Sequence, residues 1–316
     1  MLGRQRALLR DRTLMPVRSG LAALVGAPNA GKSTLFNRLT GARLSIVTPK
    51  AQTTRLRIRG VVVESTAEGD ETEIVVMDLP GIFVPRRMLD RAMVATAWRG
   101  AAEADVVLLI VDAKAGTGAV IHSIFERHAT FDKPLWLVLN KIDLPPRPLL
   151  LPLAASFNAA APFVKTFMLS AKTGDGVADL RVSLARAMPE GPHLYPPDQI
   201  SDLSERWLAA EIVREQVFLQ SGDEVPYDAT VETDQWEERK DGSVRIGASI
   251  TVARPSQKAI LIGAAGRRIR TIGTRARGVL AEALGRTVHL VLRVEVGAGW
   301  DEDPRRIATL GLEDPG

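Results

Sequence analysis

The fold of this chain is decided by the stretch Gly26-Ala27-Pro28-Asn29-Ala30-Gly31-Lys32-Ser33-Thr34. It reads G-x-x-x-x-G-K-S, a pattern whose glycines let successive backbone N–H groups point at phosphate oxygens. An apolar run, 21–25, precedes it and suits a buried strand, and apolar residues at helical spacing follow it from Leu35. A strand, a glycine-rich turn and a helix N-terminus together predict a loop that binds the phosphates of a nucleotide. Lys32 is expected to reach the β- and γ-phosphates, and Ser33 to ligate Mg²⁺.

Length and composition agree with a multidomain globular protein. The chain has 316 residues, enough for two domains, and its 46% hydrophobic and 25% charged residues are typical of folded rather than disordered chains. It has no cysteine, so neither a disulfide framework nor a thiolate metal site is expected. No apolar run is long enough to span a membrane. Residues 1–18 are interpreted as a basic arm, because they lack the long apolar core of a secretory signal.

A polar segment, 48–55, follows the first predicted helix and has neither helical nor strand patterning, so we expect a loop. In nucleotide switches a threonine on this loop ligates Mg²⁺ through its hydroxyl and donates its backbone N–H to the γ-phosphate. Thr53 and Thr54 are both candidates, and the sequence does not separate them.

Two predicted strands, 58–64 and 73–77, come next, and the second ends at Asp78-Leu79-Pro80-Gly81, a D-x-x-G sequence. A carboxylate at a strand end can hold Mg²⁺ through water, and Gly81 can offer its N–H to the γ-phosphate. In Ras-like proteins a glutamine after this glycine orients the attacking water. Here that residue is Ile82, so unaided hydrolysis is expected to be slow.

Apolar runs alternate with helical patterns in the following segment. Strands are predicted at 106–111, 135–139 and 167–169, and helices at 89–102 and 120–128. This alternation predicts an α/β fold with a mixed, mostly parallel sheet that has helices on both faces. Ligands of such sheets bind at the carboxyl ends of the strands, where all these motifs fall.

The motif Asn140-Lys141-Ile142-Asp143 predicts guanine as the base. The Asp143 carboxylate can accept hydrogen bonds from N1–H and the exocyclic amine of guanine, which adenine does not offer on that edge. Asn140 is expected to brace the loop and contact the base, and Lys141 to lie over the ring. After the next strand, Ser170-Ala171-Lys172 can bring the backbone N–H of Ala171 to guanine O6.

A proline-rich segment, 189–199, predicts a fairly stiff linker to a second, α+β domain. Ser201 and Ser204 are both N-cap candidates for the first helix of that domain. The predicted elements are, in order, a helix at 203–219, strands at 230–238 and 244–254 joined by an Asp-Gly turn, a helix at 256–262, the loop Gly263-Ala264-Ala265-Gly266, a helix at 267–283 and a strand at 287–296.

This order of elements resembles a type II KH domain, in which a G-x-x-G loop lets an RNA backbone approach closely. The segment 254–293 carries nine cationic residues against the single acid Glu282, an electrostatic footprint for nucleic acid. The alternative is a solvated arginine face on an ordinary α+β domain. The residues expected to bind RNA are Lys258, Ile262, Gly263, Ala264, Ala265, Gly266, Arg267, Arg268 and Arg270.

Together the motifs resemble the translation-factor class of GTPases, and within it the Era family. The family phrases G-x-P-N-x-G-K-S and K-A-Q-T-T-R both occur here unaltered, and the resemblance extends from about Gly20 to the C-terminus. It departs at Ala264-Ala265, where the family commonly has basic residues, and in the acidic tail, for which little structure is expected. The implied layout is an arm at 1–18, a GTPase domain at 19–188, a linker at 189–199, a KH domain at 200–300 and a tail at 301–316.

The resemblance implies a GTP-hydrolysing switch that uses Mg²⁺ and binds GTP or GDP. Its implied partners are the 3′-terminal region of 16S ribosomal RNA and the 30S subunit, whose maturation it would assist. It further implies a cytoplasmic monomer with peripheral association at the inner membrane, for which the sequence shows no anchor. Two alternatives stay open: an RNA-binding module whose GTPase domain has lost turnover, and a GTPase that acts on another RNA in tRNA modification or large-subunit assembly.

Lys32, Gly81 and one of Thr53 and Thr54 are expected to act in hydrolysis. Asn29 suggests a further route, because related GTPases with G-x-P-N-x-G-K-S bind K⁺ at this asparagine. A K⁺ ion there would neutralise charge that develops in the transition state. The alternative is that Asn29 only maintains the shape of the loop. No arginine finger can be assigned, although Arg55 lies on the loop that carries the threonines.

Overall fold

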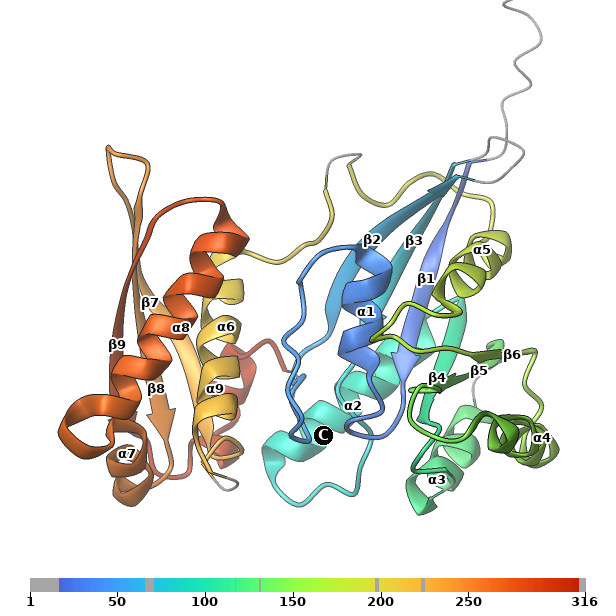
Figure 1. Ribbon diagram of the computed structural model, residues 1–316, viewed down its shortest axis with the longest axis horizontal. Helices are drawn as coiled ribbons and strands as arrows, with labels where there is room; N and C mark the ends of the chain where they lie inside the picture. The colour runs from blue at the N-terminus through green and yellow to red at the C-terminus, as the bar shows by residue number, and fades with distance from the viewer. Residues whose placement is uncertain are drawn as a thin grey trace, which may run out of the picture.

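The computed structural model describes residues 17–65, 71–116, 118–130, 132–196, 199–222 and 225–312. Two domains lie side by side, and the end of the described chain returns to the junction between them (Figure 1). The predicted basic arm falls almost entirely outside the described residues.

The N-terminal domain is built on a six-stranded sheet in the order β2-β3-β1-β4-β5-β6. Its strands are β1 (Arg18–Val25), β2 (Ile58–Ser65), β3 (Glu71–Asp78), β4 (Val106–Asp112), β5 (Leu135–Asn140) and β6 (Lys165–Met168). The β2–β3 pair is antiparallel, and the other neighbours in this sheet are parallel. The prediction of a mixed, mostly parallel sheet is therefore confirmed. Four of the five nucleotide motifs begin at the carboxyl ends of β1, β3, β5 and β6. The fifth, residues 52–55, precedes β2, whose first residue, Ile58, pairs with Asp78 at the end of the antiparallel β3.

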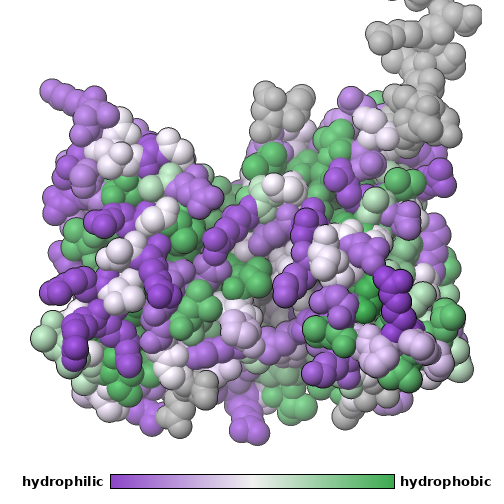
Figure 2. Space-filling view, viewed as in Figure 1, coloured by the Kyte–Doolittle hydropathy of each residue, from purple (hydrophilic) through white to green (hydrophobic). Residues whose placement is uncertain are grey.

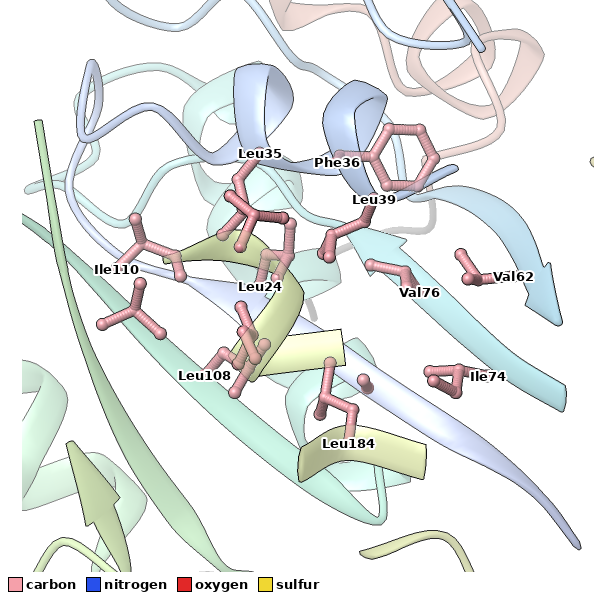
Figure 3. Close-up of a cluster of buried hydrophobic side chains, with 14 of the residues drawn as sticks. Leu24, Leu35, Phe36, Leu39, Val62, Ile74, Val76, Leu108, Ile110 and Leu184 are labelled. Atoms are coloured by element: carbon pink, nitrogen blue, oxygen red, sulfur yellow. The ribbon is translucent and has the colours of Figure 1, made fainter. Parts of the chain in front are cut away.

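Helices cover both faces of this sheet, and alternate residues of β1 serve the two cores. Ala22 and Leu24 face the core under α1 and α5, whereas Ala23 and Val25 face the core under the other helices. Figure 3 shows Leu35, Phe36 and Leu39 of α1 directed at the strands. Each such fully buried side chain contributes roughly 1.5–3 kcal/mol. The helices are α1 (Lys32–Thr40), α2 (Met88–Glu103), α3 (Ala119–His128), α4 (Leu150–Ala160) and α5 (Val177–Ala187), with a short 3₁₀ turn, η1 (Arg147–Leu149), before α4.

The C-terminal domain has a three-stranded sheet in the order β7-β8-β9, with β8 parallel to β9. Its strands are β7 (Ala229–Glu238), β8 (Val244–Val252) and β9 (Val288–Val296), and its helices are α6 (Glu205–Gln220), α7 (Pro255–Ile262) and α8 (Arg267–Leu284). Of the two cap candidates for α6, Ser204 is the N-cap, and its side chain accepts a hydrogen bond from the backbone N–H of Trp207. Val213, Ile250 and Ile272 belong to the core that joins α6 and α8 to the sheet.

Backbone hydrogen bonds hold the linker to the N-terminal domain. The N–H of Ser19 donates to the carbonyl of Pro189 at 3.1 Å, and the N–H of Val61 donates to the carbonyl of Ile200 at 2.9 Å. The buried carboxylate of Glu73 accepts from the N–H groups of Leu194 and Tyr195 at 2.6 and 3.2 Å. The linker thus crosses the amino ends of β1 and β3, and the residue that follows it, Ile200, reaches the edge strand β2.

The expectation of little structure after Trp300 is wrong. The tail forms a 3₁₀ turn, η3 (Trp300–Glu302), and a helix, α9 (Pro304–Thr309), with Asp303 as its N-cap. Trp300, Ile307 and Leu312 are buried against Leu89 and Met93 of α2. Because this apolar face finds its partner on the other domain, the composition of the tail alone did not reveal it.

Among the residues that the structure describes, no helix is long and apolar enough to cross a membrane.

Candidate nucleotide and RNA sites

The phosphate-binding loop connects β1 to α1, and its glycines are required by close packing. Gly31 has φ +93°, and a Cβ atom on it would lie 2.3 Å from the side-chain nitrogen of Asn140. A Cβ atom on Gly26 would lie 2.3 Å from the carbonyl oxygen of Ile110. A cavity of about 350 Å³ opens beside this loop. It is lined by residues of the loop and of the switch loop, residues 41–57, which joins α1 to β2.

Lys32 is buried at the start of α1, with its ammonium inside the phosphate-binding loop. Its Nζ donates to the carbonyl oxygens of Gly26 and Ala27 at 3.1 and 3.0 Å. Burial lowers the pKa of Lys32 to about 8, and the carboxylate of Asp78 opposes this shift. Anionic phosphates at this position would favour the charged form of the lysine.

Three hydroxyl groups converge on one oxygen of the fully buried Asp78. Its Oδ2 accepts from Ser33 and Ser45 at 2.7 Å each and from Thr54 at 3.3 Å, and the Ser33 and Thr54 hydroxyls lie 2.7 Å apart. Burial raises the pKa of Asp78, and the hydrogen bonds from the serines oppose that rise. The Asp78 Oδ1 atom is buried without a hydrogen-bond partner among the described residues.

The same geometry distinguishes the two candidate threonines. Thr54 lies beside Ser33 and Asp78, whereas the Thr53 hydroxyl donates to the Lys50 carbonyl at 2.8 Å and pairs with the Thr48 hydroxyl. Of the two, Thr54 is therefore the one placed to act with Ser33. Ser45 also belongs to this group of oxygens, although it was not among the predicted site residues. Sequence patterns did not reveal it, because it lies 33 positions from its partner Asp78.

This group of oxygens fits Mg²⁺. Hydroxyl and carboxylate oxygens are ligands that Mg²⁺ accepts, and the buried Asp78 Oδ1 gives the site an acceptor in need of a partner. Within the described part of the chain no cluster of three or more His, Cys, Asp or Glu side chains could hold a metal ion by itself. A Mg²⁺ ion here would depend on nucleotide phosphates for further ligands, as is usual for this ion.

Asn140 connects three loops at the predicted guanine site. Its Nδ2 donates to the carbonyl oxygen of Ala30 at 2.9 Å, and its Oδ1 accepts from the backbone N–H groups of Lys141 and Ala171 at 2.8 and 3.0 Å. The predicted bracing role of Asn140 is therefore supported by its contacts. The N–H of Ala171 donates to Asn140 in this structure, so the contact of that N–H with guanine O6 stays a prediction. Asp143 is exposed on the loop that begins at Asn140.

Lys141 lies between the phosphate-binding loop and the end of β4. Its Nζ donates to the carbonyl oxygen of Asn29 at 2.6 Å and to Asp112 Oδ2 at 2.8 Å, so two bonds hold its ammonium in place. Burial is the largest influence on Asp112 and opposes its ionisation, but the hydrogen bonds from Lys141 and from the backbone N–H groups of Lys114 and Ala115, together with the charge of Lys141, outweigh it, so the pKa of Asp112 is lowered. Asp112 was not among the predicted site residues, although the parallel register places it opposite Asn140.

The segment after Asp78 packs tightly on the phosphate-binding loop. A Cβ atom on Gly81 would approach the backbone of Pro28 at 3.0 Å, and the N–H of Ile82 donates to the carbonyl of Gly26 at 3.1 Å. The Ile82 side chain is buried and apolar, so it cannot orient a water molecule.

The G-x-x-G loop of the second domain joins α7 to α8 in a left-handed conformation. Gly263, Ala265 and Gly266 have φ values of +69°, +51° and +71°. A non-glycine residue in this conformation is strained, and a Cβ atom on Gly263 would lie 2.8 Å from the Cβ of Arg268. Arg267, Arg268 and Arg270 are all exposed beside this loop.

A groove of about 400 Å³ continues from Gly266 between α8 and β9. Leu290 and Leu292 of β9 provide apolar surface, and Arg270 and Arg277 provide charge. Ile269, Gly273 and Thr274 complete this lining, which was not predicted. Following the face of the predicted helix from Gly266 at intervals of three and four residues would have found most of it.

Some of the arginines on the predicted basic face form ion pairs with acidic side chains. Arg254 lies 3.5 Å from Asp228, and Arg286 pairs with Glu205 and Glu238 at 2.5 and 3.3 Å. Hydrophilic side chains nevertheless predominate on the visible surface of the lobe that carries α8 (Figure 2). This polar surface and the adjacent groove suit a phosphate backbone with its bases.

The phosphate-binding loop, the oxygen cluster at Asp78 and the G-x-x-G loop define a P-loop GTPase joined to a KH domain. Residues 21–141 match the family model described as 50S ribosome-binding GTPase, and residues 224–301 match that of the KH domain. The chain is 51% identical to GTPase Era of Afipia carboxidovorans, over 95% of this chain and 96% of that protein, and 52% identical to GTPase Era of Rhizobium meliloti, over 95% of each. The chain belongs to the GTPase Era family.

Two solved Era structures are similar to the whole fold. One is a variant of Aquifex aeolicus Era bound to GDP and AlF4⁻, and the other is Era in complex with MgGDPNP and nucleotides 1506–1542 of 16S ribosomal RNA. Each has a TM-score of 0.89 and 36% sequence identity, and covers 94% of this chain and 99% of the other. The fold prediction is thereby confirmed for both domains.

Proposed function

We propose that this GTPase uses Mg²⁺·GTP to control binding of its KH domain to the 3′ region of 16S ribosomal RNA, and thereby assists maturation of the 30S subunit. The observation that carries the proposal is the presence of both sites in one chain. The Ser33, Thr54 and Asp78 oxygens form a Mg²⁺ site, and the groove beside Gly266 forms an RNA site. The complex of Era with MgGDPNP and 16S RNA supports the same assignment.

In the proposed reaction, Lys32 and the backbone N–H groups of 26–34 bind the phosphates, and Ser33, Thr54 and Asp78 hold Mg²⁺. The bound ion would neutralise phosphate charge. Thr54 and Gly81 are assigned the γ-phosphate through their backbone N–H groups. Asn140, Lys141 and Asp143, with 170–172, select guanine. We further propose K⁺ at Asn29, a monomeric state and action in the cytoplasm, with peripheral membrane association as an additional prediction.

Binding of a labelled RNA with the sequence of nucleotides 1506–1542 tests the RNA assignment. The full chain should bind this RNA more tightly with a non-hydrolysable GTP analogue than with GDP. Gly266→Asp should weaken binding by about tenfold or more, because it adds a negative charge and strains a left-handed position. Its GTP affinity should not change.

Gly242→Asp provides a matched control. Like Gly266, Gly242 has positive φ, at +79°, and among the described residues a Cβ atom on either glycine would meet only open space within 4 Å. Gly242 differs in place, because it lies in the β7–β8 turn away from α7 (Figure 1). Equal weakening by both variants would contradict the site. Tighter binding of tRNA or of a 23S fragment would favour a different RNA substrate, and equal RNA affinity with both nucleotides would favour an RNA-binding module without a working switch.

A further inference from the structure

Two consecutive buried residues of helix α6, Arg214 and Glu215, hold the switch loop of the other domain. Arg214 Nη2 donates to the carbonyl oxygen of Thr53 at 2.5 Å. Glu215 Oε1 accepts from the backbone N–H of Val47 at 3.1 Å, and its Oε2 pairs with Arg43 at 2.5 Å. These contacts tie both halves of the switch loop to one turn of a KH-domain helix.

Neighbouring side chains of α6 hold the Arg214 guanidinium in the orientation in which it contacts the switch loop. Its Nε and Nη2 donate to the Glu211 carboxylate at 2.7 and 2.5 Å, and its guanidinium carbon lies 5.3 Å from the centre of the Phe218 ring. Only 2% of the Arg214 side chain is exposed. Burying charged groups costs free energy that an apolar pair of similar size would avoid, so this ion pair is not evidence of added stability. Its two hydrogen bonds instead define the direction in which the guanidinium reaches Thr53.

The contact at Thr53 controls the direction of a functional group on the next residue. Because a peptide unit is planar, a fixed Thr53 carbonyl also fixes the direction of the Thr54 N–H. The Thr54 hydroxyl in turn lies 2.7 Å from Ser33 and 3.3 Å from Asp78. Arg214 therefore acts one peptide bond away from the proposed Mg²⁺ site.

The contacts of Glu215 connect α6 to the Asp78 carboxylate through a second segment of the switch loop. Arg43 and Val47 flank Ser45, whose hydroxyl donates to Asp78 Oδ2 at 2.7 Å. From α1, Asn37 holds the same segment, since its side chain bonds the backbone N–H and carbonyl of Ser45. Helix α6 thus contacts the two loop segments that carry Thr54 and Ser45 to Asp78.

We propose that Arg214 and Glu215 are positioning residues for GTP hydrolysis, and that they make closure of the switch loop depend on docking of the KH domain. Since α6 also packs against α8, which lines the RNA groove, the same helix contacts the structures that bind each ligand. The inference rests on the proposed role of Thr54. Coupling of this kind is reciprocal, so GTP should change RNA affinity by the same factor as RNA changes GTP affinity.

The test compares full-length wild type, Arg214→Gln, Arg214→Lys and Glu215→Gln. In each we would measure affinity for GDP and for a non-hydrolysable GTP analogue, and the single-turnover rate at saturating Mg²⁺·GTP. Arg214→Gln should lower the ratio of analogue affinity to GDP affinity by about tenfold, because it removes one hydrogen bond from a charged group. The same variant should also lower the single-turnover rate. Arg214→Lys should restore part of both losses. Glu215→Gln should give a smaller loss, because it keeps the acceptor for Val47.

Arg206→Gln, an exposed arginine on the same helix, is the matched control and should resemble wild type. A purely structural role would weaken GDP and analogue binding equally, and that result would overturn the inference. If Arg214→Gln does not fold, Arg43→Gln tests the second route from the half-exposed side of its ion pair. An unchanged analogue-to-GDP ratio and rate in the folded variants would likewise overturn it.

Thr54→Ala separates this inference from the proposed function. If Thr54→Ala lowers the rate and Arg214→Gln does not, only the positioning role fails. If Thr54→Ala has no effect, the assigned Mg²⁺ site is wrong and the positioning role fails with it. Arg214 positions both the hydroxyl and the backbone N–H of Thr54, and Thr54→Ala removes only the hydroxyl. Arg214→Gln should therefore cost less in Thr54→Ala than it does in the wild type, and fully additive losses would contradict the proposed route.

Discussion

The guanidinium of Arg55 donates a 2.8 Å hydrogen bond to the carbonyl oxygen of Ala229 in the KH domain. It also donates to the carbonyls of Pro226 and Tyr227, at 3.3 and 3.2 Å, and lies over the ring of Trp300. Burial and the nearby Arg214 lower the pKa of Arg55 to about 9, so it remains protonated near neutral pH. Arg55 therefore joins the switch loop to the second domain and points away from the phosphates.

Arg55→Ala should lower the free energy of unfolding by roughly 2–4 kcal/mol, because it leaves buried carbonyls without a donor. Denaturant titration of the full chain measures this effect, with Arg91→Ala on the exposed side of α2 as control. The single-turnover rate should fall far less than the roughly thousandfold loss seen when an arginine finger is removed. A thousandfold loss with unchanged stability would instead make Arg55 a catalytic residue.

Asp143→Asn should reverse the base preference. An amide donor would face the exocyclic amine of guanine, whereas xanthine presents a carbonyl there, so XTP should bind better than GTP. A site built around a specific hydrogen bond discriminates by roughly 10⁴ when that bond is lost. Competition binding of the two nucleotides provides the measurement, with the exposed Asp179→Asn as control. An unchanged preference for GTP would contradict the assignment of Asp143.

Asn29 should confer a requirement for K⁺. In the structure its Nδ2 donates to the carbonyl of Pro49 at 3.1 Å, so the residue also connects the phosphate-binding and switch loops. We expect turnover to be about tenfold or more faster in KCl than in NaCl at matched ionic strength, and this difference to disappear in Asn29→Ala. Asn158→Ala, on α4, should retain it. A K⁺ effect that survives in Asn29→Ala would leave Asn29 only its contact with the loop.

Deprotonation of Lys32 should lower the affinity for GTP as the pH rises above 8. Its folded-state pKa of about 8 lies below the ordinary 10.5, so at higher pH nucleotide binding must take up a proton. GTP affinity should then fall by up to about tenfold per pH unit, an effect absent in Lys32→Met and retained in Lys114→Met. Between pH 8 and 10.5 the unfolded chain holds a proton that the folded chain has lost, so the lysine's contribution to stability rises with pH. A GTP affinity independent of pH from about 7 to 9 would be incompatible with this pKa.

Short-range patterns were sufficient for most elements of the fold. The strand before Gly26, the helix from Lys32 and the strand ending at Asp78 each follow from periodicity within a few residues. Helix α4 did not, because its apolar residues have little periodicity and Pro152 lies within its first turn. Proline is tolerated there, since the first-turn N–H groups lack partners within the helix.

The details of the sites depended on contacts between distant positions. Choosing Thr54 over Thr53 required the direction of two neighbouring side chains, which sequence patterns do not specify. The Lys141–Asp112 pair joins two loops, and the Arg214–Thr53 contact spans 161 positions. Hydrophobic periodicity describes one helix or strand at a time, so it could not predict contacts between elements of different domains.

The contact between Arg87 and Asp301, 3.2 Å apart and separated by 214 positions, also sets an order of events during synthesis. A ribosome adding about 5–20 residues per second needs roughly 10–40 s to pass from one to the other. The phosphate-binding loop is already synthesised when that interval begins, and α2 follows at its start, well before α6 and the tail exist. The GTPase domain is therefore synthesised before the segments that restrain its switch loop and α2, and its contacts with the second domain are complete only after Asp301 and α9 have been added.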